Sequence, residues 1–241
     1  MIQLKQFSIG YGDRILLKDV NTEIEAGKLT ALIGRNGTGK STLLRAIAGL
    51  NTHFKGEILL NEEDICAMKP QQMAKTLAFV TTERTRIANL RCEDVVAIGR
   101  APYTNWIGRM QPQDREIVMQ SLEAVGMASY AQKTMDRMSD GECQRIMIAR
   151  ALAQSTPVIL LDEPTSFLDM PNRYELCTLL ANLAHSQEKC ILFSTHELDI
   201  AQSLTDEIAL INPPQLIVEP SEKMREEGLI ERLFNLAHYC R

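Results

Sequence analysis

The stretch Gly34-Arg35-Asn36-Gly37-Thr38-Gly39-Lys40-Ser41-Thr42 decides the fold, because it joins two segments of different character. The apolar run 29–33 before it predicts a buried strand, and the apolar residues of 43–50 after it recur at helical spacing. Three glycines between a strand and a helix let backbone N–H groups curl around an anion at the positive end of that helix. The stretch therefore predicts a phosphate-binding loop.

The two residues after the last glycine give this loop its chemistry. Lys40 adds a mobile positive charge for β- and γ-phosphates, and Ser41 offers a hydroxyl to Mg²⁺. A glycine-rich turn without a function would not require a Lys-Ser pair directly after its last glycine. We therefore expect a nucleoside triphosphate with Mg²⁺ at this loop.

The composition is that of an ordinary globular protein. The 241 residues are 45% apolar and 24% charged, enough for one large domain or two closely joined ones. The balance of 26 basic and 31 acidic residues gives a net charge of -5, which argues against a nucleic-acid partner. The six cysteines form no Cys-x-x-Cys pair, which excludes a zinc knuckle and a dithiol redox motif and favours scattered reduced thiols.

The chain shows no pattern that predicts insertion into a membrane. No window approaches the ~18 continuous apolar residues of a spanning helix, and the amino terminus lacks a basic segment followed by an apolar one. We expect the protein to stay in the cytoplasm and to reach a membrane only through a partner.

Strand and helix patterns alternate in the last third of the chain. Apolar runs at 158–161, 190–193 and 207–211 are separated by a helix that Pro171 opens and by a second helix near 197–204. Fully apolar strands must be covered by helices on both faces, so the sequence predicts an α/β core with a mostly parallel sheet.

The first third adds shorter elements. Residues 2–9, 15–24 and 56–61 carry strand patterns, and the expected fold includes a small antiparallel β portion. Pro70 opens a helix that runs to about Lys75, and 77–80 is a short buried strand.

The middle of the chain is helical. Residues from about 90 to 155 show helical spacing without a convincing strand, and the Gly- and Pro-containing loops 99–103 and 108–112 are expected on the surface. Residues 224–237 predict one docked terminal helix. The expected division is a first part of the nucleotide-binding core at 1–83, a helical subdomain at 84–155, and a second part of the core with the terminal helix at 156–241.

Two acids follow the apolar run 158–161, at the strand end where open α/β sheets bind ligands. Asp162 is suited to hold Mg²⁺, and Glu163 is suited to polarise the water that attacks the γ-phosphate. An Asp-Glu pair after a strand is also common as a helix cap, but the upstream phosphate loop favours the catalytic interpretation. If the strands are parallel, His196 lies at the same end and can reach the γ-phosphate, although a lone loop histidine usually has no function.

Two further positions are candidates for nucleotide contacts. Tyr11, between two glycines, is able to stack on a purine, although a turn tyrosine is more often a packing residue. Ser139, with Gly141 nearby, is a plausible cap for the apolar helix that follows, which would make a second anion site. That site cannot easily serve its own chain's phosphate loop if it lies on a distant insertion, which suggests the nucleotide of another chain.

Taken together, these segments resemble the ATPase subunit of an ABC transporter over nearly the whole chain. The resemblance rests on 34–42, on 139–142, on 160–169 and on His196, in this order. It implies a head-to-tail dimer in which each ATP lies between one chain's phosphate loop and the other chain's signature near 138–142. It also implies that Tyr11 stacks on adenine and that Asp169 lies in the loop linking the two sites.

The resemblance gives a full list of expected contacts. The ATP-binding residues would be Tyr11, Gly34, Asn36, Gly37, Gly39, Lys40, Ser41, Thr42, Ser139, Gly141 and Asp169; the catalytic residues Glu163 and His196; and the Mg²⁺ ligands Ser41, Glu83 and Asp162. The implied partners are ATP, a second copy of the chain, permease subunits in the inner (plasma) membrane and, through them, a substrate-binding protein. The chain would then be peripheral on the cytoplasmic face.

Within this family, residues 10–14 and 95–103 look most like the ATPases of iron-siderophore, haem and cobalamin importers. Two positions depart from the usual family pattern: Asp140 stands in place of a glycine, and Glu83 in place of the glutamine that bridges Mg²⁺ and the permease. A carboxylate at 83 can still coordinate Mg²⁺, with Arg84 and Arg86 offsetting its charge. A solvated loop acid remains the alternative.

Three other functions compete with this interpretation of the sequence. A soluble ABC protein that acts on ribosomes or DNA would normally need a second ATPase half, a long coiled-coil insertion or basic arms, which this sequence lacks. A regulatory module without turnover is disfavoured because Glu163 and His196 are both present. An ABC transporter for another substrate stays open.

Overall fold

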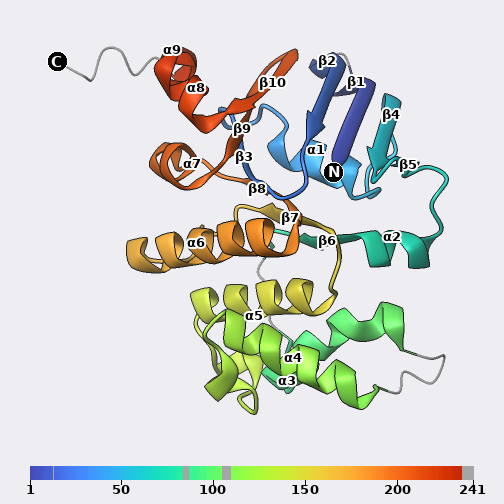
Figure 1. Ribbon diagram of the computed structural model, residues 1–241, viewed down its shortest axis with the longest axis vertical. Coiled ribbons are helices and arrows are strands. Elements are labelled where there is room, and N and C mark those ends of the chain that lie inside the picture. Colours follow the sequence, from blue (N-terminus) through green and yellow to red (C-terminus); the bar gives the residue numbers. More distant parts are fainter. Residues whose placement is uncertain (13, 84–86, 105–109, 235–241) are drawn as a thin grey trace.

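The computed structural model describes residues 1–12, 14–83, 87–104 and 110–234, apart from the side chain of Glu231. A six-stranded sheet in the order β10-β9-β3-β8-β7-β6 forms its centre (Figure 1). Its strands are β3 (Leu29–Ile33), β6 (Leu77–Val80), β7 (Val158–Asp162), β8 (Cys190–Ser194), β9 (Glu207–Asn212) and β10 (Gln215–Pro220). All neighbours are parallel except β10, which runs antiparallel to β9. The predicted α/β fold with a mostly parallel sheet is confirmed.

The central strands are apolar throughout because both of their faces are covered. Ile191 and Phe193 of β8 pack in the cluster that contains α6 (Met170–Gln187) and α7 (Leu198–Leu204). Cys190 and Leu192, which alternate with them, pack in the cluster that contains α1 (Lys40–Ile47). Successive strand residues point to opposite faces, so each strand contributes to both clusters.

A four-stranded antiparallel sheet in the order β2-β1-β4-β5 lies over α1. Its strands are β1 (Ile2–Tyr11), β2 (Arg14–Ile24), β4 (Phe54–Leu60) and β5 (Glu63–Asp64). The helix α2 (Pro70–Thr76) then leads into β6. The predicted antiparallel portion is therefore present, whereas β5 and β10 have no counterpart in the sequence-based assignment.

Helices occupy the middle of the chain and gather below α6 in Figure 1, away from the four-stranded sheet. They are α3 (Cys92–Ala97), η1 (Ile98–Tyr103), α4 (Pro112–Ala124), η2 (Ala128–Tyr130), η3 (Met135–Arg137) and α5 (Asp140–Ala153). None of the helices within the described ranges is both long and apolar enough to cross a membrane.

The prediction that 99–103 is a surface loop is wrong in part, because the first half of this segment is buried in η1. The Nε of Arg100 lies 2.9 Å from Oδ1 of Asp114, and both side chains are buried. The same guanidinium donates to the carbonyl oxygen of Ala153 at 2.7 Å and to Ser155 Oγ at 3.0 Å. A Cβ on Gly99 would approach the carbonyl oxygen of Arg150 to 2.3 Å, so only glycine fits here. Of the loop predicted at 108–112, residues 108 and 109 lie outside the described range.

The prediction of a single terminal helix at 224–237 is also wrong, because the chain forms two short helices there. They are α8 (Ser221–Glu226) and α9 (Leu229–Phe234), and the glycine between them, Gly228, has a φ of 61° that ends the first helix. Residues 235–237 of the predicted helix lie outside the described residues. The carbonyl oxygen of Leu233 in α9 accepts a hydrogen bond of 2.6 Å from Arg35 of the phosphate loop.

Candidate functional site

The carboxyl ends of three neighbouring strands bring the predicted residues together. Strand β8 lies between β3 and β7, and Ser194, its last residue, pairs in register with Leu32 on one side and with Asp162 on the other. The loop 34–42 follows β3, the two acids end β7, and His196 follows β8. Parallel strands end at the same edge, so a ligand on the loop faces all three segments.

The loop has the backbone that an anion cradle requires. Gly37 and Gly39 have φ values of 75° and 106°, which other residues rarely adopt, and α1 begins directly after Gly39. The Nζ of Lys40 donates to the carbonyl oxygen of Gly34 at 2.9 Å. Burial lowers the pKa of Lys40, and the negative charges of Glu163 and Asp162 partly offset that effect. Lys40 therefore lies inside the loop, with both acids near enough to affect its titration.

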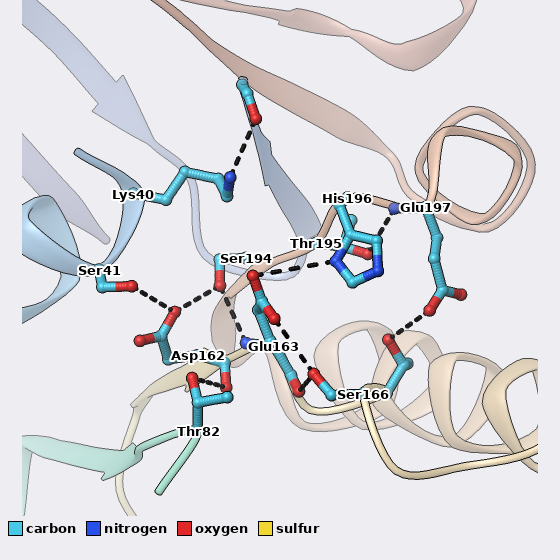
Figure 2. Close-up of polar contacts among 12 residues, drawn as sticks. Lys40, Ser41, Thr82, Asp162, Glu163, Ser166, Ser194, Thr195, His196 and Glu197 are labelled. Carbon is cyan, nitrogen blue, oxygen red and sulfur yellow. Dashed lines mark hydrogen bonds and ion pairs between the residues drawn. The ribbon is translucent and has the colours of Figure 1, made fainter. Parts of the chain in front are cut away.

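Ser41 and Asp162 form an oxygen pair that fits Mg²⁺. The Ser41 hydroxyl donates to Oδ1 of the buried Asp162 at 3.1 Å (Figure 2). Octahedral Mg²⁺ with Mg–O distances of about 2.1 Å requires adjacent oxygen ligands ~3 Å apart, so this separation matches two such ligands. One hydroxyl and one carboxylate are also hard oxygen donors of the type that Mg²⁺ selects.

Glu163 has an unusual backbone next to this pair. Its φ is 49°, a left-handed conformation that costs a non-glycine residue energy and that is concentrated at active sites. Ser166 donates to its carbonyl oxygen at 2.8 Å and to its Oε2 at 3.2 Å, and Nδ1 of His196 lies 3.8 Å from its Oε1 (Figure 2). About 30% of the Glu163 side chain is exposed, so a water molecule can reach the carboxylate.

Tyr11 lies at the end of β1, beside the start of α1. Its hydroxyl is 3.2 Å from Oγ1 of Thr42, and 60% of the residue is exposed. The tyrosine therefore combines an exposed ring with a position next to the phosphate loop. Within that loop, the side chain of Asn36 is also exposed.

Glu83 takes a different position from the other predicted Mg²⁺ ligands. Its carboxylate pairs with Arg45 at 3.5 Å, and 77% of its side chain is exposed. The preceding residue, Thr82, donates to the backbone carbonyl oxygen of Asp162 at 3.0 Å. The structure thus brings Thr82, not Glu83, to the acid pair. The arginines proposed to offset the charge of Glu83, Arg84 and Arg86, lie outside the described residues.

The second predicted anion site begins α5. Ser139 Oγ accepts from the N–H of Glu142 at 3.2 Å, and the Glu142 carboxylate accepts from the N–H of Ser139 at 2.7 Å, so the two form a capping box. The bond from the Ser139 N–H, together with that from its hydroxyl, lowers the pKa of Glu142. The predicted serine cap is therefore confirmed.

A cavity of about 570 Å³ opens at this helix start. It is lined by 126–127, Tyr130, 139–142, Arg145, 167–169, Asn172 and Glu175. Asp169 caps α6 by accepting from the N–H of Asn172 at 3.1 Å, and a Cβ on Gly141 would approach the carbonyl oxygen of Phe167 to 3.1 Å. No lining residue comes from the phosphate loop of this chain, so the phosphate loop and this cavity are separate places in the described part of the chain.

The sequence-based reasoning missed three polar groups at the acid pair. They are Thr82, Ser166 and Ser194, each of which bonds to Asp162 or Glu163. A lone hydroxyl residue has no distinctive sequence pattern. The pairing of β6 and β8 with β7 brings Thr82 and Ser194 to the two acids, whereas Ser166 reaches Glu163 through a local turn three residues on. The one available signal was their place at or just beyond strand ends.

Comparisons with known proteins match most of the chain. A family described as ABC transporter matches residues 17–166. An uncharacterised ABC transporter ATP-binding protein of Methanocaldococcus jannaschii is 41% identical over 238 residues, which cover 98% of this chain and 82% of that protein. The petrobactin import ATP-binding protein FpuD of Bacillus anthracis is 35% identical over 236 residues, which cover 98% of this chain and 86% of that protein.

Among solved structures, an ABC transporter assigned to the metal-chelate type, in an inward-facing conformation, has a similar chain. The TM-score is 0.83 at 27% identity, and the match covers 97% of this chain and 88% of the other.

Proposed function

The chain belongs to the ATP-binding proteins of ABC transporters, and we propose how it hydrolyses ATP and which residues take part. It is an ATPase that drives transport, and it serves an importer of iron siderophores or other metal chelates. The main support for this mechanism is that Lys40, the Ser41–Asp162 pair and Glu163 lie close together at one end of the sheet.

The proposed chemistry divides the reaction among these groups. The loop N–H groups from Gly34 to Gly39 and the positive end of α1 hold the phosphates, and Lys40 neutralises charge on the β- and γ-phosphates. Mg²⁺ held by Ser41 and Asp162 would stabilise the charge that develops between these two phosphates. Glu163 accepts a proton from the attacking water.

The remaining contacts position the nucleotide. His196, near Glu163, donates a hydrogen bond to the γ-phosphate, and the exposed ring of Tyr11 stacks on adenine. Asn36 and Thr42 complete the phosphate contacts. Glu83 remains a proposed Mg²⁺ ligand, but its carboxylate must first leave Arg45. The geometry favours Thr82 as the residue of this segment that contacts the acid pair.

Two copies of the chain are needed to complete each site. The half-site of Ser139, Gly141 and Asp169 has an anion-binding helix start but no phosphate loop of its own. We therefore propose a head-to-tail dimer in which this half-site closes over the partner's ATP.

We divide each chain into two core parts, 1–83 and 156–241, around a helical subdomain at 84–155. The dimer binds permease subunits at the cytoplasmic face of the membrane, and through them a substrate-binding protein.

ATP should therefore drive dimerisation, most strongly when hydrolysis is blocked. We expect Glu163→Gln with Mg·ATP to elute as a dimer in size-exclusion chromatography with light scattering, and as a monomer with ADP. A second change, Ser139→Glu, should keep that variant monomeric because its carboxylate would repel the partner's γ-phosphate. A monomer under every nucleotide condition, with the permease also present, contradicts the model.

The transport function is tested in the complete complex. The chain is reconstituted in liposomes with its copurified permease and substrate-binding protein, and phosphate release is followed with ferric siderophores, sugars or amino acids added. We expect ferric chelates alone to stimulate hydrolysis, and Lys40→Met to abolish it. Stimulation by a sugar or amino acid, with no response to any metal chelate, would disprove the proposed cargo.

A further inference from the structure

One buried hydroxyl joins the two acids on which the proposed mechanism depends. Ser194, the last residue of β8, is completely buried. Its hydroxyl donates to Oδ1 of Asp162 at 2.6 Å and accepts from the backbone N–H of Glu163 at 2.9 Å (Figure 2). We propose that Ser194 is a positioning residue that sets both the Mg²⁺ affinity and the rate of the hydrolytic step; this inference rests on the proposed ATPase function.

The first bond acts on the Mg²⁺ ligand. Asp162 Oδ1 accepts from both Ser41 and Ser194, so these two hydroxyls fix the plane of the carboxylate. Ser194 therefore holds in place the carboxylate oxygen that lies 3.1 Å from Ser41 Oγ, the separation that two adjacent Mg²⁺ ligands need. Hydrogen bonds to ligating carboxylates typically change metal affinity or activity by 10–100-fold.

The second bond acts on the base through its backbone. Glu163 keeps its left-handed φ of 49° only if the surroundings stabilise that conformation. Its N–H donates to the Oγ of the fully buried Ser194, so loss of the hydroxyl removes the partner of that N–H. The peptide would then relax and turn the carboxylate away from the attacking water.

Strand register explains why one side chain does both tasks. Asp162 and Ser194 are paired residues at the ends of parallel strands, so their side chains emerge side by side. A serine hydroxyl has one proton to donate and lone pairs to accept, which matches the two bonds. On the other flank, Thr82 donates to the backbone carbonyl oxygen of Asp162 and not to its carboxylate, among the residues that the structure describes.

The test compares Ser194→Ala with a matched control, Thr156→Val. Thr156 is also buried, but its hydroxyl bonds to the carbonyl oxygen of Val158 at the opposite end of β7. In Ser194→Ala we expect kcat at saturating Mg·ATP to fall about 10–100-fold, with the Mg²⁺ midpoint raised by a similar factor. Binding of a fluorescent ATP analogue in EDTA should stay unchanged, because the phosphate loop is intact. Thr156→Val should match the parent in all three measurements.

Direct metal binding separates this proposal from the ATPase assignment. Mn²⁺ affinity in the presence of ADP, followed by electron paramagnetic resonance, should fall in Ser194→Ala even if the parent proves inactive as an ATPase. If the unmutated protein shows no ATPase activity, the proposed function is overturned, but the role of Ser194 in metal binding is not. Equal Mn²⁺ affinity and equal kcat in Ser194→Ala and Thr156→Val overturn the role of Ser194. If the alanine variant does not fold, Ser194→Cys replaces it with the same expectation, because a thiol is a weak donor of nearly the same size.

Discussion

Glu163→Gln should bind ATP as the parent does and hydrolyse it more slowly by a factor of about 10²–10⁴, the usual contribution of a general base. Glutamine keeps the size of the side chain and the bond from Ser166, but its amide cannot accept a proton from water. Steady-state phosphate release at saturating Mg·ATP measures the rate, and a fluorescent nucleotide measures binding.

The control for this experiment is Glu57→Gln. Glu57 is an exposed glutamate of β4, in the antiparallel sheet and outside the proposed site. The Glu57→Gln variant should hydrolyse ATP at the parent rate. That result would show that the loss of one negative charge does not by itself slow hydrolysis. A Glu163→Gln variant with the parent rate would mean that another group activates the water.

Arg100→Met should destabilise the protein by about 3–5 kcal/mol, because it leaves the buried carboxylate of Asp114 without its cation. Bonds from the N–H of Gln111 and from Arg100 lower the pKa of Asp114, so this carboxylate is charged at neutral pH and costly to leave unpaired. The same change also deprives the carbonyl oxygen of Ala153 of its donor. Urea unfolding followed by circular dichroism measures the loss.

Two further variants identify the cause of this loss. Arg100→Met with Asp114→Leu removes both charges and should recover part of the stability, because the uncompensated charge is gone. Lys223→Met breaks the exposed ion pair with Glu219, which has a similar length of 2.9 Å, and should leave the urea midpoint close to that of the parent. If Arg100→Met unfolds at the same urea concentration as Lys223→Met, the buried pair does not stabilise the helical region.

The features that sequence reasoning located lie in contiguous segments. The phosphate loop and the pair Asp162-Glu163 can be recognised because a strand, a short run of polar residues and a turn or helix follow one another directly. The fold class was predictable for the same reason, since apolar runs with helices between them require a covered parallel sheet. The cap at Ser139 also depends only on residues within one turn of α5.

The features that sequence reasoning missed depend on contacts between distant segments. Ser194 reaches the acids through the register of β7 and β8, which no local pattern encodes. The segment 95–103 resembles one group of importers, yet its Arg100 binds Asp114 and Ala153 inside the protein, so this arginine maintains the fold. A Gly-Arg-Ala-Pro run looks like a loop from composition alone, and only tertiary packing shows that half of it is buried.

The place of β3 in the sheet has a consequence for how the chain folds during synthesis. Leu29 pairs with Ile191 and Thr30 with Glu207, so both neighbours of this early strand leave the ribosome only after most of the chain. The antiparallel sheet of β1, β2 and β4 relies on nearer partners and can form first. Contacts between such distant residues slow folding and leave apolar surface exposed in the meantime. The nascent chain is therefore prone to aggregation until its last strands emerge.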